Sequence, residues 1–307
     1  MHDKSKQHNN SNNASIINGW IREMLPTFGE CNNDGLNDSG FNIDYCAIKE
    51  SFGVSGDSCS SSLNKLDIFR QLVLIDSLYS TNVNRMRQFG IAEICDDIWK
   101  MCDNHKGNHT LGTLTTQLDP TKPLPTDIAE LFTNKYGYIK GEQSDSAPSL
   151  ISKYFFFATA KCPLIGNWGF PIYDTIACDL LRSVQRFLGI PLTPTKNFDL
   201  VNGTLDINVY VDGLRRIVVE LEKADYGLWN HTSMTKFQIL DYFLWHIGKA
   251  GKKSYNLLLT KNEVKTCYNN GVLTTVPHRI SVWEQHYKCL KSYRISSQTH
   301  SVKKKHP

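Results

Sequence analysis

The sequence lacks any long apolar run. The five residues Tyr154–Ala158 form a short run, far below the ~18 residues that a transmembrane helix needs. Residues 1–15 are polar and rich in Asn, so they contain no apolar signal-peptide core. These absences argue against a membrane protein and against export. We therefore expect a cytoplasmic protein with no membrane partner.

Several familiar catalytic and metal-binding motifs are also missing. The nine cysteines include no CxxC pair, which fits a reducing compartment better than a disulfide framework. His246, His278 and His286 lack the spacing of metal ligands, and Gly53–Gly56 has no following Gly-Lys-Ser/Thr. A Ser-His-Asp hydrolase would need a nucleophile elbow, which the chain does not have. We expect neither a metal nor another cofactor.

Charge is distributed unevenly along the 307 residues. The net charge is +4, but Lys249–Pro307 holds twelve Lys and Arg against two Glu, whereas the first 248 residues hold 22 basic and 28 acidic side chains. Aromatic residues interleave with the basic ones, among them Tyr255, Trp283 and Tyr293. This pattern favours a folded basic surface that contacts nucleic-acid phosphates. The alternative is a solvated basic tail, and Lys303–Lys305 alone would support only that.

The pattern of apolar residues predicts a mainly α-helical protein in three parts. Residues 1–62 form a loose N-terminal region, disordered over 1–13 and irregular over 26–62; 63–250 form a helical domain; 251–307 form a basic C-terminal segment. The one candidate strand is 254–260. The predicted helices cover about 63–79, 86–99, 174–188, 206–222 and 232–248, with another that begins at Pro125.

Two short segments hold the candidate chemistry. The first is Ala-Pro-Ser-Leu-Ile-Ser-Lys, residues 147–153, and the second is Phe-Pro-Ile-Tyr-Asp, residues 170–174, which opens an amphipathic helix. We expect Lys153 to be partly desolvated, which lowers the pKa of an amine and favours its nucleophilic form. We expect Asp174 to stay ionised at a helix N-terminus, where it can accept a proton or stabilise a cationic sugar. Taken singly, Asp174 could be only an N-cap and Lys153 only a helix-surface charge.

These segments resemble the helix-hairpin-helix DNA glycosylase superfamily, and within it the 8-oxoguanine glycosylase branch. That family has a Leu-Pro-Gly-Val-Gly-Thr-Lys hairpin, an apolar helix and then Pro-Val-Asp at the start of the next helix. Residues 147–153 align with the hairpin and 171–174 with the later motif, and the spacing of 21 from Lys153 to Asp174 is close to the family's. Residues 78–82 resemble the Ser-Ser-Asn segment after the family's early core helix. The resemblance covers roughly 63–250 and implies a two-lobed helical fold.

The resemblance implies a base-flipping DNA N-glycosylase, with or without β-lyase activity. It would remove a damaged or modified base from double-stranded DNA, in repair or antiviral defence, and act as a monomer. Lys153 would be the Schiff-base nucleophile and Asp174 its electrostatic partner. The DNA- and base-binding candidates are Asn82, to fill the gap left by the extruded base, Phe157 and Trp245 in the base pocket, and Ser149 and Ser152 in the hairpin. The alternative roles are a helix N-cap for Asn82 and core packing for Phe157 and Trp245.

The hairpin departs from the family at two positions. Ser149 and Ile151 occupy the positions of the family's two hairpin glycines. Without glycine's access to positive φ, the turn that presents backbone N–H groups to a phosphate is altered. A non-catalytic DNA-binding or interaction module on the same fold is therefore the alternative function. An oxidised purine and a hypermodified viral base fit the sequence equally as the target.

Overall fold

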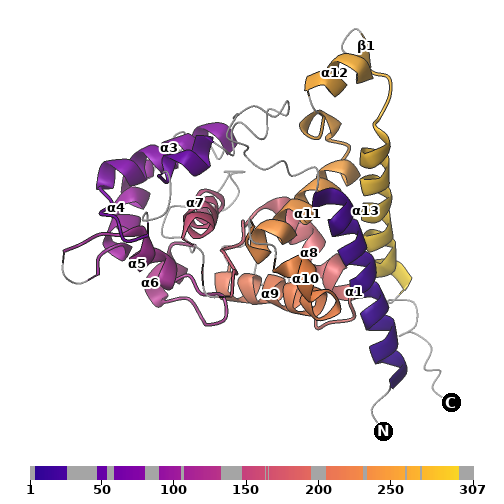
Figure 1. Ribbon diagram of the computed structural model, residues 1–307, viewed down its shortest axis with the longest axis horizontal. Coiled ribbons are helices and arrows are strands. Elements are labelled where there is room, and N and C mark those ends of the chain that lie inside the picture. Colours follow the sequence, from indigo (N-terminus) through magenta and orange to yellow (C-terminus); the bar gives the residue numbers. More distant parts are fainter. Residues whose placement is uncertain are drawn as a thin grey trace, which may run out of the picture.

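The computed structural model shows a mainly α-helical protein, which confirms the predicted class (Figure 1). Within the described residues, the only strands form one two-stranded antiparallel hairpin, besides two isolated bridges. None of the described helices is long and apolar enough to cross a membrane. The structure describes residues 4–25, 47–53, 59–79, 90–104, 107–132, 147–162, 164, 166–194, 205–230, 234–259, 261–269 and 272–296.

The helices fall into two groups, which Figure 1 shows on its left and right sides. The first group is α3 (Lys65–Tyr79), α4 (Ile91–Met101), α5 (Leu111–Thr116), α6 (Thr126–Glu130) and α7 (Ala147–Lys161). The second group is α1 (Lys4–Met24), α8 (Thr175–Phe187), α9 (Ile207–Ala224), α10 (Tyr226–Trp229), α11 (Lys236–Gly251) and α13 (His278–Ser296). Between α11 and α13 come η6 (Tyr255–Leu257), α12 (Lys261–Cys267), β1 (Tyr268–Asn269) and β2 (Val272–Leu273). One continuous apolar core joins both groups.

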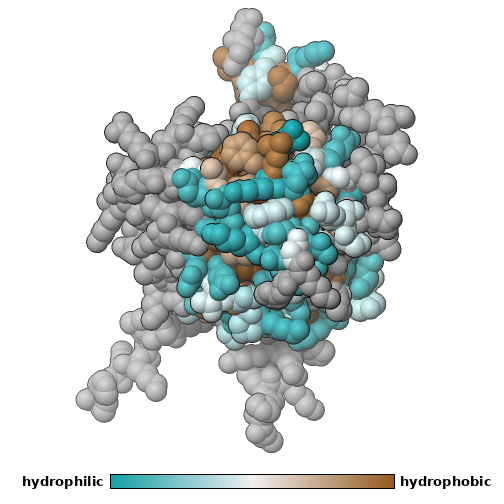
Figure 2. Space-filling view, turned by 90° about the vertical axis from the view of Figure 1, so that its left-hand side faces the viewer, coloured by the Kyte–Doolittle hydropathy of each residue, from teal (hydrophilic) through white to brown (hydrophobic). Residues whose placement is uncertain are grey.

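Helix α7 occupies the interior of the first group, between α3 and α5. From Ala147 to Thr159 its side chains are buried on all sides, apart from half-buried Ser149, as expected for a helix that is mainly apolar around its circumference. The outer side of this group is mainly hydrophilic, with a hydrophobic patch in its upper part (Figure 2). The exposed apolar side chains of α3 include Leu66 and Phe69.

Helix α8 follows its predicted bounds closely and packs on α9, α11 and α13. Asp174 caps its N-terminus, since Oδ1 accepts a hydrogen bond from the Ala177 N–H at 2.6 Å. Gly189 ends it with a left-handed φ of 68°. Gly248 of α11 lies so close to α8 that an added Cβ would stand 2.1 Å from Ile176 Cγ2. The two helices therefore cross in near-backbone contact at the N-terminal end of α8.

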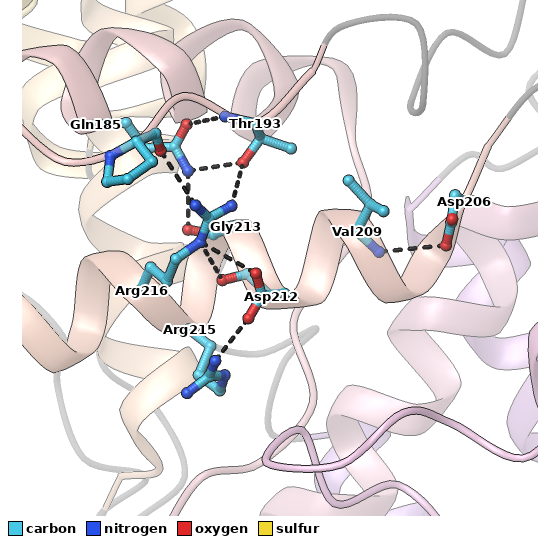
Figure 3. Close-up of polar contacts among 9 residues, drawn as sticks. Gln185, Thr193, Asp206, Val209, Asp212, Gly213, Arg215 and Arg216 are labelled. Carbon is cyan, nitrogen blue, oxygen red and sulfur yellow. Dashed lines mark hydrogen bonds and ion pairs between the residues drawn. The ribbon is translucent and has the colours of Figure 1, made fainter.

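A buried polar network fixes the other end of α8 against α9 (Figure 3). The Gln185 amide donates to Thr193 Oγ1 at 2.7 Å and to the Gly213 carbonyl at 3.1 Å, and its oxygen accepts from the Thr193 N–H at 2.8 Å. A Cβ on Gly213 would lie 2.3 Å from Thr193 Oγ1, so only glycine leaves room for these bonds. With both ends held, α8 presents Asp174 in a defined position.

The expectation of disorder over 1–13 is wrong for residues 4–13, which belong to α1. The helix packs on α9 and buries Ile17, Ile21 and Met24 completely. Asn18 is buried with them, and its amide donates to the Leu221 carbonyl at 2.8 Å. This tertiary packing outweighs the weak helix propensity of the preceding Asn-rich stretch.

The predicted strand at 254–260 is also wrong, because Tyr255–Leu257 form the 3-10 turn η6. Lys253, shortly before this turn, has a left-handed φ of 57°, and the Arg279 guanidinium donates to the Leu258 carbonyl at 3.0 Å. A disulfide that the sequence did not predict joins Cys59 to Cys162, just after α7. Five other described cysteines are free thiols.

Candidate active site

Residues 147–153 form the first two turns of α7, so the hairpin predicted for them is wrong. None of these residues has a positive φ, which the family's hairpin glycines would supply. Pro148 suits the first turn of a helix, where its missing N–H has no partner to lose. Ser149 and Ile151 have the right-handed preference of ordinary L-residues, and they continue the helix to Lys153.

Lys153 lies in a buried position, with 8% of its surface exposed. Its Nζ donates to Ser149 Oγ at 2.8 Å, one turn earlier in α7, and lies 5.1 Å from the centre of the Tyr79 ring. A neutral hydroxyl and an aromatic face are therefore among its neighbours. The expectation that this lysine is removed from bulk water is confirmed.

The segment that leads to Asp174 is tied to α7 and α9 at three points. The Phe170 N–H donates to Thr159 Oγ1 at 2.8 Å, and the Tyr173 N–H donates to Ser152 Oγ at 2.9 Å. The Tyr210 hydroxyl donates to the Ile172 carbonyl at 2.8 Å. The Ser152–Tyr173 bond joins the residue before Lys153 to the residue before Asp174. It thereby holds the amine-bearing turn of α7 beside the N-terminus of α8, as a preorganised site requires.

Asp241 of α11 is a site residue that sequence reasoning missed. Burial raises the pKa of its carboxyl well above the ordinary value, the negative charge of Asp174 raises it further, and the nearby Lys153 opposes the rise. Asp241 therefore lies within electrostatic reach of both predicted catalytic residues. A usable signal existed in the sequence, since this acid interrupts the apolar stretch 239–247 of a buried helix.

The face of α11 that holds Asp241 continues through Trp245 to Lys249, at helical spacings of four. Trp245 is half-buried, and Lys249 Nζ lies 5.7 Å from its ring centre. Burial lowers the pKa of the Lys249 amine, and the charge of Asp174 opposes this shift. Because Asp174 influences both Asp241 and Lys249, this face of α11 is directed toward the start of α8.

Two further titratable groups surround Asp174 in this region. Burial raises the pKa of the Cys178 thiol to about 12, with a smaller effect of Asp174. Burial also raises the pKa of Tyr210 well above its ordinary value. The Tyr210 ring meets the Tyr173 ring edge to face, with centroids 5.1 Å apart. These two groups stay neutral near pH 7, so they add no charge around Asp174.

The remaining predicted residues divide by position. Ser149 and Ser152 lie at the site, where they bond to Lys153 and to the chain before Asp174. Trp245 lies on the same helix face as Asp241. Phe157 is fully buried and packs against the rings of Tyr79 and Phe52, with centroids 6.2 Å apart in both pairs. Asn82 lies outside the described residues.

The site thus combines a buried amine, an N-capping carboxylate and a half-buried carboxyl group whose pKa is raised. Such a set can provide a nucleophile, a stabilising negative charge and a proton carrier. Among the described residues, no group of His, Cys, Asp and Glu side chains is arranged to hold a metal ion. Searches against protein-family models, curated proteins and solved structures found no match.

Proposed function

We propose that the protein is a DNA N-glycosylase, with or without β-lyase activity, that removes a damaged or modified base extruded from the duplex. The observation that supports it most is the bond between Ser152 and Tyr173, which holds the turn bearing buried Lys153 beside the turn capped by Asp174. A buried amine beside carboxyl groups suits attack on a sugar C1′.

In the proposed reaction, the Lys153 amine attacks C1′ and the bond from C1′ to the base breaks. The electron pair leaves with the base, which takes up a proton, and the proton released by the amine passes to a carboxylate. Asp174 provides negative charge opposite the cationic sugar as the bond breaks. Asp241, whose raised pKa favours the protonated form, is suited to hold the proton between steps. Trp245 offers an aromatic face for the extruded base.

The arrangement of the helices supports a two-lobed glycosylase fold. Lys153 belongs to the α3–α7 group, whereas Asp174 begins α8 in the other group (Figure 1). The proposed site therefore lies where the two groups meet, the usual place for a pocket that takes a ligand. The basic C-terminal segment follows directly from the α11 face that holds Trp245 and Lys249.

The alternative is a non-catalytic DNA-binding module on the same fold. One observation favours it: residues 147–153 are helical, so the glycine turn that would present N–H groups to a phosphate is absent there. Under this alternative, Lys153 and Asp174 are structural and no covalent intermediate forms.

Borohydride trapping on duplexes with oxidised, alkylated, deaminated or abasic sites tests the enzyme directly. We expect a covalent adduct with the wild type and none with Lys153→Gln, while duplex affinity stays nearly unchanged because one nucleophile contributes little to binding. Lys161→Gln, at the other end of α7, is the matched control and should trap normally. A base-release screen by mass spectrometry on damaged and phage-modified DNA would then identify the base. No adduct and no released base on any substrate would leave only the binding module.

A further inference from the structure

The chain between α11 and α13 forms a protrusion, which we call the α12 arm and define as the described residues 252–259, 261–269 and 272–277. In Figure 1, α12 and β1 stand beyond the upper end of α13, away from both helix groups. In the turned view of Figure 2 the protrusion again stands above the body, with hydrophilic and hydrophobic residues on it. Among its described residues, Leu257, Val264 and Val272 are the large apolar side chains that are exposed.

The α12 arm is braced against α13. The Arg279 guanidinium forms an ion pair with the Glu263 carboxylate, with 2.6 Å between Nη2 and Oε2. The Tyr255 hydroxyl donates to Glu284 at 2.9 Å. At the hairpin, the Thr274 N–H donates to the Cys267 carbonyl at 2.7 Å. The first two contacts hold the arm against α13, and the third stabilises the hairpin within the arm.

The same braces leave the arm with unpaired positive charge. Glu263 is engaged by Arg279, and Glu284 by Tyr255 and Lys288, so both acids of Lys249–Pro307 are already neutralised. Lys252, Lys253 and Lys265 are exposed and form no ion pair with another described residue. The charge of Lys253 helps to lower the pKa of the nearby Glu284, but the two form no ion pair. Exposed ammonium groups on a braced support complement a polyanion.

The first of these lysines, Lys252, follows directly after the helix that holds Trp245. From Trp245 to Lys252 the helix rises about 10 Å, which is roughly the axial length of three base steps. Lys249 lies between them, over the Trp245 ring. A duplex that places a base at Trp245 would therefore bring its flanking phosphates to the C-terminal end of α11 and onward to the arm.

We propose that the α12 arm binds the phosphates of duplex DNA on one side of the extruded nucleotide, through Lys252, Lys253 and Lys265. This inference rests on the proposed function and assigns the polarity of its DNA contact. It predicts a footprint that extends farther on one side of the target base than on the other.

The test compares two triple variants with the same change in net charge. The arm variant is Lys252→Glu, Lys253→Glu and Lys265→Glu. The control is Lys49→Glu, Lys100→Glu and Lys122→Glu, three lysines that are also exposed but lie outside the arm. We expect the arm variant to flatten the slope of log affinity against log salt by about 2.7, at about 0.9 for each lost phosphate contact. It should also shorten the footprint on one side, whereas the control should change neither. The milder Lys→Gln triple, measured in parallel, should give the same result if the Glu variant folds poorly.

Equal losses in the arm and control variants would overturn the inference, since they would reflect net charge alone. Binding of anionic phosphatidylserine vesicles that the arm variant abolishes, with duplex binding unchanged, would overturn it in favour of a lipid surface. If the wild type traps lesion DNA but the arm variant keeps the full salt slope, only the arm assignment fails. If the wild type neither traps nor releases any base, but the arm variant flattens its salt slope as expected, the glycosylase is contradicted and the phosphate contact of the arm stands.

Discussion

Asp174 has two roles at the residue scale that one substitution can separate. As an N-cap it accepts the Ala177 N–H, and Asn caps a helix about as well as Asp. As a charge it faces Asp241 and Lys249, and Asn removes that charge. Asp174→Asn should therefore keep the free energy of unfolding within about 0.5 kcal/mol and lower single-turnover base release on the order of 100-fold.

The matched control for Asp174→Asn is Asp206→Asn, at the N-cap of α9. Asp206 accepts the Val209 N–H at 3.2 Å (Figure 3), so the control makes the same cap change away from the site. It should leave base release unchanged. Full base release by Asp174→Asn would overturn the catalytic assignment, whatever urea unfolding shows.

Replacing Asp241 with Asn should raise the stability of the protein at pH 7 and lower its activity. Because the pKa of Asp241 is raised in the folded protein, the folded state holds more protons than the unfolded state at any pH between the two pKa values, and stability falls as pH rises through that interval. Asp241→Asn removes this cost, so the variant should unfold at higher urea than the wild type at pH 7 and lose that advantage below about pH 4. Base release should fall on the order of 100-fold. Its pH profile should also lose the limb that the titration of Asp241 causes. A variant that is less stable at pH 7, or that keeps the wild-type pH profile, would contradict this assignment.

At the scale of elements, the crossing of α8 and α11 depends on Gly248. A Cβ there would lie 2.1 Å from Ile176 Cγ2 and 3.4 Å from Leu180 Cδ1, and these are buried side chains without room to move. Gly248→Ala should destabilise the protein by about 1–3 kcal/mol, the usual cost of overpacking, and urea unfolding would measure it. Ile176→Ala shortens the side chain that the new Cβ would meet. Gly248→Ala should therefore cost less free energy of unfolding in the Ile176→Ala background than in the wild type.

Gly19 of α1 is the matched control for the crossing, since nothing lies within 4 Å of its added Cβ. Gly19→Ala should stabilise the protein by up to about 1 kcal/mol, because Ala favours the helix. Destabilisation at both glycines would show that the helices tolerate no Cβ for reasons other than the α8–α11 contact.

The sequence predicted α8 well because its signals are local: an apolar stripe, Asp174 at the start and Gly189 at the end. The hairpin expected at 147–153 is wrong because the family's turn depends on two glycines, whereas Ser149 and Ile151 at those positions prefer the right-handed helical conformation. Sequence reasoning missed Asp241, although an acid within the apolar stretch 239–247 was a usable signal; only the packing of α11 shows which charged groups lie near that acid. The α1 packing and the Cys59–Cys162 bond likewise depend on contacts between residues far apart in the chain, which no local pattern encodes.

At the scale of the whole molecule, two histidines link stability to pH. Burial lowers the pKa of His246 to about 4, the charge of Arg279 lowers it further, and the hydrogen bond with the Tyr242 carbonyl opposes the shift. Burial also lowers the pKa of His286 to about 4, and its ring stacks on Trp20 of α1 at 4.2 Å. His246 lies in α11 and His286 in α13, so protonation would place charge inside the second helix group.

The sign of this effect follows from proton binding. Between an ordinary His pKa of about 6.5 and the folded value of about 4, the unfolded chain holds more protons, so stability falls as pH drops through that range. For His246 the loss from pH 7 to pH 4 should be on the order of 3 kcal/mol, measured as a lower urea midpoint. In His246→Asn this decline should be shallower by a similar amount, whereas His278→Asn, at an exposed position at the start of α13, should follow the wild type. A wild-type slope in His246→Asn would mean that the ring is solvated, and that the core around Trp245 and Trp283 is looser than its packing indicates.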